Sequence, residues 1–174
     1  MLALSYTISI LCMLLLPVTL AVLFRRHYRV FWILFVVGTL TFLGSQVVHL
    51  PLNSWLADIG LLPGTSSLDG PPLWRTALIL GLSAGLCEES ARAIGYGIVK
   101  WARRFEDGVM LGLGHGGIEA MIFGGVLTAA TVSSLLSLQG IDLESLNLSA
   151  AQMDAISLQA EQFSAAPLYA FAPL

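Results

Sequence analysis

Four long apolar segments determine what this chain can fold into. A helix needs about 20 mostly apolar residues to cross the hydrocarbon core of a bilayer. Four segments meet that requirement, at about Leu2–Phe24, Val30–Leu52, Leu73–Val99 and Gly108–Leu138. The sequence therefore predicts an all-α fold, a polytopic transmembrane bundle of four spanning helices that forms a single membrane domain over residues 1–174. A further apolar run begins at Pro167, which we expect to be the start of a fifth helix.

The composition supports the membrane class and excludes others. Of the 174 residues, 56% are hydrophobic and 11% are charged, and the mean hydropathy is +0.83. A soluble domain usually carries about 25% charged residues. The net charge of −3, with no basic cluster among aromatic residues, argues against a nucleic-acid partner and leaves the lipid bilayer as the expected one. Cys12 and Cys87 both lie in apolar segments, so neither a disulfide framework nor a CxxC metal signature is expected.

The basic residues predict the orientation in the membrane. Residues 1–24 carry no charge and are followed by arginines, the reverse of the order in a signal peptide, so we expect an uncleaved first helix. Positively charged loops stay in the cytoplasm, which places the N-terminus outside. Six of the eight basic residues lie in the two short loops after the first and third segments: Arg25, Arg26, Arg29, Lys100, Arg103 and Arg104.

The two outer loops differ in character. Residues 53–72 are rich in Gly, Pro, Ser and Asp, which is typical of irregular structure. Residues 139–166 are acidic and form the predicted extracytoplasmic loop. Within it, Ser149 and Gln152 have the spacing of a helix capping box, and apolar residues follow at roughly helical intervals. We expect a short amphipathic helix there, lying on the outer surface of the membrane.

Five ionisable residues lie inside the third and fourth apolar segments: Glu88, Glu89, Arg92, His115 and Glu119. A charge at the centre of a bilayer costs about 2.5–3.5 kcal/mol even on the lenient insertion scale, so such groups usually have a partner or a function. At about 1.5 Å of rise per residue, both sets lie roughly 12–18 Å from the inner surface. They share one layer of the membrane, on glycine-containing faces that can pack closely.

Two kinds of chemistry are open to these groups. Glu88 with His115 could activate a water molecule, with the imidazole assisting at a developing oxyanion. Alternatively, Glu88, His115 and Glu119 could bind zinc. Arg92 is equally well explained by a structural ion pair with Glu88 or with Glu89.

The second apolar segment contributes two further polar residues, Gln46 and His49. They lie near its outer end, farther from the inner surface than the other groups. A site role and an ordinary histidine at the membrane interface are both compatible with that position.

These residues resemble the motifs of a known family. Glu88-Glu89-Ser-Ala-Arg92 looks like the EExxR motif, and Gly112-Leu-Gly-His115-Gly-Gly-Ile-Glu119-Ala looks like the GxGHGGxEA motif, of the bacterial YhfC-type intramembrane protease family. That family is related to the CAAX prenyl endopeptidase and bacteriocin-immunity superfamily. The segment Ser45-Gln46-Val-Val-His49-Leu-Pro51 also resembles its second-helix pattern.

The resemblance implies an intramembrane endopeptidase in a bacterial cytoplasmic membrane, acting on a membrane-associated peptide or protein. Glu88 would activate water and Arg92 would orient it, while His115 would position the water or stabilise the oxyanion and Glu119 would support His115. The wider superfamily carries a further histidine on a later helix, so we expect the chain to lack C-terminal helices. No three-ligand set is unambiguous, so the sequence favours no metal cofactor, with zinc as the alternative.

Two other functions remain open. The same carboxylates could serve a membrane transporter or a protein that binds metal ions or protons. Alternatively, Glu88, Glu89 and Arg92 could simply lock helices together in a non-catalytic membrane scaffold. The sequence names neither the substrate nor the oligomeric state.

Overall fold

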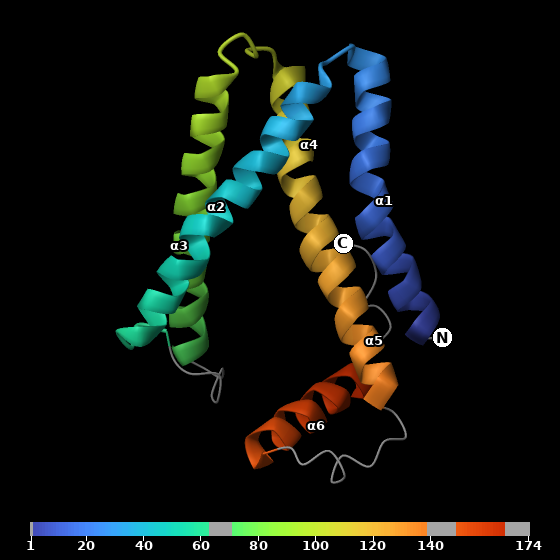
Figure 1. Cartoon of the computed structure of the whole chain (residues 1–174), viewed down its shortest axis with the longest axis vertical. Helices are drawn as coiled ribbons and strands as arrows, with labels where there is room; N and C mark the ends of the chain where they lie inside the picture. Colours follow the sequence, from blue (N-terminus) through green and yellow to red (C-terminus); the bar gives the residue numbers. More distant parts are fainter. Residues whose placement is uncertain (1, 63–70, 139–148, 166–174) are drawn as a thin grey trace. The chain divides into compact units, whose positions relative to one another are not determined.

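The structure, a computed structural model, describes residues 2–62, 71–138 and 149–165, and every regular element in those residues is helical. This confirms the predicted all-α class for the part of the chain that is described. Figure 1 shows the elements in chain order: α1 (Leu2–Tyr28), α2 (Trp32–Asp58), α3 (Pro71–Ile98), α4 (Phe105–Glu119), the π-helix η1 (Ala120–Leu127), α5 (Thr128–Leu138) and α6 (Ala150–Ala165).

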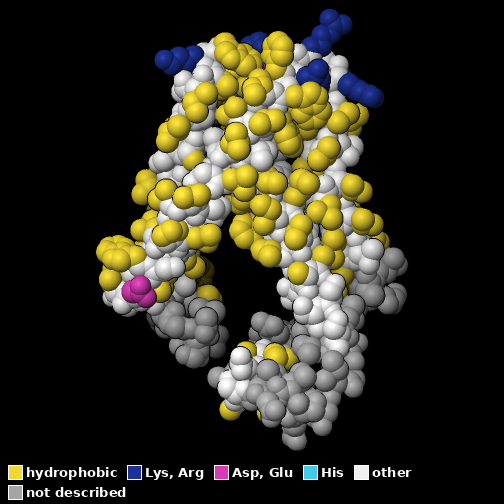
Figure 2. All heavy atoms as spheres, in the orientation of Figure 1, with side chains coloured by type: hydrophobic (Ala, Val, Ile, Leu, Met, Phe, Trp, Pro, Cys, Tyr) yellow, Lys and Arg dark blue, Asp and Glu magenta, His cyan; other side chains and the backbone are white. Residues whose placement is uncertain are grey.

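Within the described residues, three helical stretches are long and apolar enough to cross a membrane: Tyr6–Tyr28, Trp32–Asp58 and Phe105–Ser134. Figure 2 shows hydrophobic side chains spread over the outside of the molecule, as expected of a surface in contact with lipid. The remaining predicted span does form a helix, α3, whose 28 residues extend over about 42 Å. Because α3 carries three ionisable residues in its central turns, it is less apolar than the others. The four-span prediction is thus confirmed for three helices, and the run from Pro167 lies outside the described residues.

Contacts divide the chain into two units. The first contains residues 1–18 and 119–174, and the second contains residues 19–118. The prediction of a single membrane domain stays a prediction.

In the first unit, the predicted fourth segment departs from regular α-helix. Residues 120–127 of that segment form the π-helix η1, in which Gly124 and Gly125 face α1. A Cβ on Gly124 would lie 2.9 Å from Cγ of Met13, and one on Gly125 would overlap Leu14. The two glycines therefore allow η1 to approach α1 closely. The sequence pattern did not predict this π-helix.

The predicted capping box is confirmed at the start of α6. The backbone nitrogen of Gln152 donates to Oγ of Ser149 at 3.3 Å, and the backbone nitrogen of Ser149 donates to Oε1 of the Gln152 side chain at 3.0 Å. This reciprocal pair satisfies two backbone donors that the first turn of a helix leaves without partners. Met153 and Ile156 are half-buried on one side of the helix, and Asp154 on another side is exposed.

The hydrophobic core of the second unit lies where the α1–α2 and α3–α4 turns meet. The first turn closes at Arg29, which has a left-handed φ of 54° and donates its amide to the Arg25 carbonyl. Across the turns, Phe31 packs edge-on against Trp101 with the ring centroids 5.5 Å apart. The buried members of this core are Ala21, Val30, Leu34, Val99, Ala102, Met110 and Leu111.

The two basic loops lie together at this end of the second unit (Figure 2), and their location in the cytoplasm stays a prediction. Figure 2 shows the Lys and Arg side chains gathered there. All six are exposed: Arg25, Arg26, Arg29, Lys100, Arg103 and Arg104.

Helices α2 and α4 cross in backbone contact at two glycines. A Cβ on Gly38 of α2 would overlap the carbonyl oxygen of Leu111, and a Cβ on Gly114 of α4 would overlap the carbonyl oxygen of Phe35. Small residues at such crossings let membrane helices approach closely. This crossing brings the next turn of α2 beside His115, the residue that follows Gly114.

Replacing Gly38 with alanine is expected to lower the free energy of unfolding by about 1–3 kcal/mol, since a methyl group forced between two backbones must separate the helices. Gly44→Ala is the matched control, because Gly44 lies on the same helix and a Cβ there meets nothing within 4 Å. Unfolding of both variants in detergent, followed by helicity, measures the difference. Equal stability of the two variants would contradict the close crossing.

Candidate functional site

His115 is the most enclosed ionisable side chain among those predicted to form the site. It lies on α4 and is 1% exposed. Its Nδ1 is 2.9 Å from the hydroxyl of Thr41 on α2. The Phe42 ring stands at right angles to the imidazole, with the ring centroids 5.5 Å apart. Two neighbouring residues of α2 therefore determine where the imidazole lies and how it is turned.

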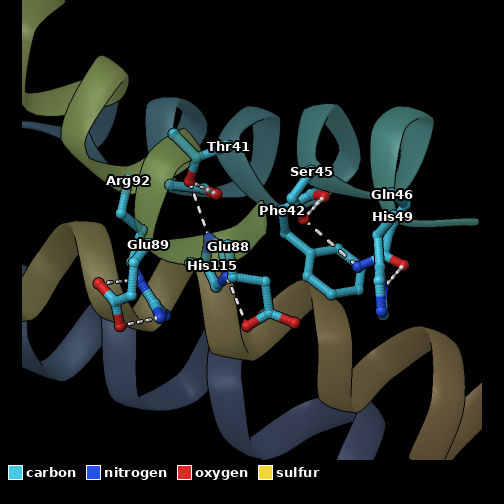
Figure 3. A network of polar contacts seen from close by, with 10 residues as sticks. Thr41, Phe42, Ser45, Gln46, His49, Glu88, Glu89, Arg92 and His115 are labelled. Carbon is cyan, nitrogen blue, oxygen red and sulfur yellow. Dashed lines mark hydrogen bonds and ion pairs between the residues drawn. The ribbon is translucent and has the colours of Figure 1, made fainter. Parts of the chain in front are cut away.

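Glu88 of α3 approaches the imidazole at its second nitrogen. One carboxylate oxygen, Oε2, lies 3.6 Å from Nε2 of His115. The Glu88 side chain is 18% exposed, whereas His115 is enclosed. Figure 3 shows the carboxylate and the imidazole directed toward each other from separate helices. The structure thus brings together the two residues that the sequence analysis assigned to water activation.

Arg92 makes its ion pair with Glu89. Its Nη2 lies 2.5 Å from Oε1 of Glu89, and its Nε lies 3.4 Å from the other carboxylate oxygen. The Glu89 side chain is 73% exposed and that of Arg92 is 29% exposed. This pair neutralises both charges on the outer face of α3, beside Glu88 but directed away from His115 (Figure 3). Such a pairing agrees with the structural alternative for Arg92.

Gln46 and His49 belong to a polar network that joins α2 to α3. Asn53 donates from Nδ2 to Nε2 of His49 at 2.9 Å, and the Ser83 hydroxyl of α3 donates to Oδ1 of Asn53 at 2.8 Å. Nδ1 of His49 lies 3.4 Å from Oε1 of Gln46. With both ring nitrogens engaged, His49 holds helices together in this structure, and its contacts are with amide and hydroxyl groups.

Glu119, the fifth predicted residue, ends α4 and is half-buried. It is the first residue of the unit formed by residues 1–18 and 119–174, whereas the other predicted site residues belong to the second unit. It lies one helical turn after His115 on the same helix.

Sequence reasoning missed Thr41 and Phe42, which contact His115, and it missed Asn53 and Ser83. A signal for Thr41 was present. Thr41, Ser45 and His49 recur every four residues in an apolar segment, so three polar side chains share one face of the helix. The Phe42 contact carried no such signal, because phenylalanine is ordinary in a membrane helix.

The Glu88 and His115 donors are compatible with part of a metal site. Two atoms that each bind one zinc ion at about 2.0–2.2 Å can lie up to about 4 Å apart. The 3.6 Å between Nε2 of His115 and Oε2 of Glu88 is within that limit. Nδ1 is held by the Thr41 hydroxyl, and the second nitrogen of a metal-binding histidine is likewise usually held by a hydrogen bond. Among the residues that the structure describes, no group of three His, Cys, Asp or Glu side chains is gathered for a metal.

A protein-family model described as YhfC intramembrane metalloprotease matches residues 12–172. This confirms the family resemblance inferred from the motifs. The description points to a metal cofactor, so the preference for a metal-free site is wrong. The preference rested on the lack of an unambiguous three-ligand set in the sequence; the described residues bring His115 and Glu88 together but gather no third ligand, so the metal cofactor is inferred from the family description.

One relative extends the comparison to a named organism. The chain is 29% identical over 171 residues to a protein of Bacillus subtilis (strain 168) described as "Uncharacterized membrane protein YhfC". The alignment covers 97% of this chain and 63% of the relative, so the chain spans less than two thirds of that protein's length. No solved structure matches the chain. Because the family model matches nearly all of its residues, this chain, a membrane protein, belongs to the YhfC intramembrane metalloprotease family.

Proposed function

We propose that this protein is an intramembrane metallopeptidase in which Glu88 and His115 form the reactive pair. The observation that carries the proposal is the 3.6 Å approach of the Glu88 carboxylate to Nε2 of a fully enclosed histidine, between helices of a membrane protein. Ionisable groups inside a membrane are a functional site by default. The pairing of a carboxylate with an imidazole is also the arrangement that peptide hydrolysis uses for proton transfer.

The two oxygens of the Glu88 carboxylate would serve different purposes. Oε2 faces the imidazole. In the proposed reaction Oε1 of the carboxylate takes a proton from the attacking water and later returns it to the leaving amine of the cleaved peptide bond, while Oε2 is the oxygen that would bind the metal. His115 and Glu88 would hold the metal, and the predicted role of Glu119 at the site stays a prediction. A bound divalent metal such as zinc would supply Lewis-acid polarisation of the water and of the scissile carbonyl.

The proposed substrate is a membrane-associated peptide or protein, because the pair lies among helices whose outer surfaces are apolar. The exposed basic loops would face the cytoplasm of a bacterial cell, leaving the N-terminus outside. The Glu89–Arg92 pair would keep α3 neutral beside Glu88, so that the Glu88 charge alone faces the imidazole.

Metal removal tests the proposal. The full chain is reconstituted in liposomes with a library of single-span peptides, and products are identified by mass spectrometry. Cleavage with zinc present is expected to fall at least about 100-fold after chelation and to recover on addition of zinc. Cleavage that persists without metal would contradict a metallopeptidase. Zinc transport across the vesicle wall without cleavage would favour the transporter instead.

A further inference from the structure

We infer that Thr41 is a positioning residue that decides which nitrogen of His115 carries the ring proton. The inference rests on the proposed function, in which Nε2 faces the reacting groups. A neutral imidazole offers one bare nitrogen and one protonated nitrogen. The hydrogen bond made by the nitrogen that does not react determines which of the two carries the proton.

The single proton of the Thr41 hydroxyl settles the direction of the hydrogen bonds. Its oxygen lies 2.6 Å from the carbonyl oxygen of Gly38; two oxygens this close need a hydrogen between them, and because a carbonyl can only accept, the hydroxyl donates there. The same oxygen lies 2.9 Å from Nδ1 of His115. Since the hydroxyl has no second proton to give, it accepts at that contact and Nδ1 is the donor. In the neutral ring, Nε2 is then the unprotonated nitrogen, the form in which it could bind a metal shared with Oε2 of Glu88.

The packing around Thr41 makes this arrangement rigid. Thr41 is 8% exposed. The backbone contact of α2 with α4 at Gly38 and Gly114 fixes the separation of the two helices, so Thr41 cannot move away without breaking that contact. Gly95 of α3 packs against the other side of Thr41, where a Cβ would lie 2.5 Å from the threonine methyl carbon. The Thr41 hydroxyl is thus held between the Gly38 carbonyl of its own helix, α2, and the His115 imidazole of α4.

The tautomer of His115 can be measured directly. The chain has three histidines, so the nitrogen resonances of 15N-histidine-labelled protein are assignable with the variants His27→Gln and His49→Gln. In metal-free wild type with neutral rings, we expect His115 to carry its proton on Nδ1 and to show a bare Nε2. Thr41→Val should mix the two tautomers. A wild-type His115 protonated on Nε2 would overturn the inference.

Zinc affinity provides a second readout. Groups that hold the other nitrogen of a metal-binding histidine typically contribute 10–100-fold to metal affinity. Titration of the full chain with Zn²⁺ alone should therefore show a loss of about 10–100-fold in Thr41→Val, and Thr41→Ser should restore most of it. Ser45→Ala is the matched control, because that hydroxyl donates to the Phe42 carbonyl at 2.7 Å on the same helix. Equal zinc affinity in Thr41→Val and Thr41→Ser would overturn the inference.

The two readouts separate this inference from the proposed function. A wild type that neither binds zinc nor cleaves peptides would defeat the metallopeptidase, but the tautomer measurement would still decide the role of Thr41. If Thr41→Val does not fold, the position of the His115 ring proton is measured in the wild type and in Thr41→Ser. A proton on Nδ1 in both supports the inference, and a proton on Nε2 in either contradicts it.

Discussion

Peptide cleavage by the Glu88→Gln variant is expected to fall by about 10²–10⁴-fold, the usual contribution of a positioned acid or base. Glutamine matches glutamate in size but cannot take a proton from water. Because Glu88 lies 3.6 Å from His115 without a short hydrogen bond, the substitution should leave the helices in place. Initial rates in liposomes measure the loss, and thermal unfolding in detergent checks the fold.

Glu89→Gln is the control for that variant. Glu89 is the adjacent residue of α3 and has the same chemical type, but its carboxylate is 73% exposed and pairs with Arg92. Exposed ion pairs contribute about 0–1 kcal/mol to stability, so this variant should be slightly less stable and nearly fully active. If Glu88→Gln cleaved as fast as Glu89→Gln, Glu88 would not be the base.

Zinc binding is expected to weaken by at least about 100-fold in His115→Gln, since the imidazole supplies a metal ligand and its supporting groups alone are worth 10–100-fold. The expected loss follows from the direction of Nε2, which faces the Glu88 carboxylate from a side chain that is 1% exposed. Competition with a chromophoric chelator measures the affinity of the folded protein in detergent.

His49→Gln serves as the comparison for that experiment. His49 is also a partly enclosed histidine of a membrane helix, but its contacts are with Gln46, Asn53 and Ser83. Its loss should lower stability and leave zinc affinity within a few-fold of wild type. Equal loss of zinc affinity in the two variants would mean that His115 has no special role in holding the metal.

The helices that the sequence predicted are those with a strong, uninterrupted apolar pattern. The segment starting at Leu2 became α1 almost as expected, although α1 continues through the arginines to Tyr28. The Ser149–Gln152 capping box was predictable because it needs only four consecutive residues. The π-helix was not predictable, because hydrophobic periodicity cannot distinguish five-residue from four-residue hydrogen bonding over eight residues.

The site residues were easier to predict than their partners. Ionisable residues are rare in apolar segments and usually functional there, so Glu88 and His115 could be predicted from the sequence. The partner of Arg92 was not, because residues three and four positions away on a helix are both within reach. Only the fold shows that Arg92 pairs with Glu89. Thr41 was missed because its role depends on the Gly38–Gly114 crossing, a contact between residues far apart in the chain.

The most direct measurement is X-ray absorption at the zinc edge of the zinc-loaded full chain, beside His115→Gln. We expect an imidazole among the zinc ligands of the wild type, and no imidazole signal from any zinc retained by the variant. A wild-type zinc environment without imidazole, or one that His115→Gln leaves unchanged, would contradict the claim that His115 and Glu88 hold the metal of an intramembrane peptidase.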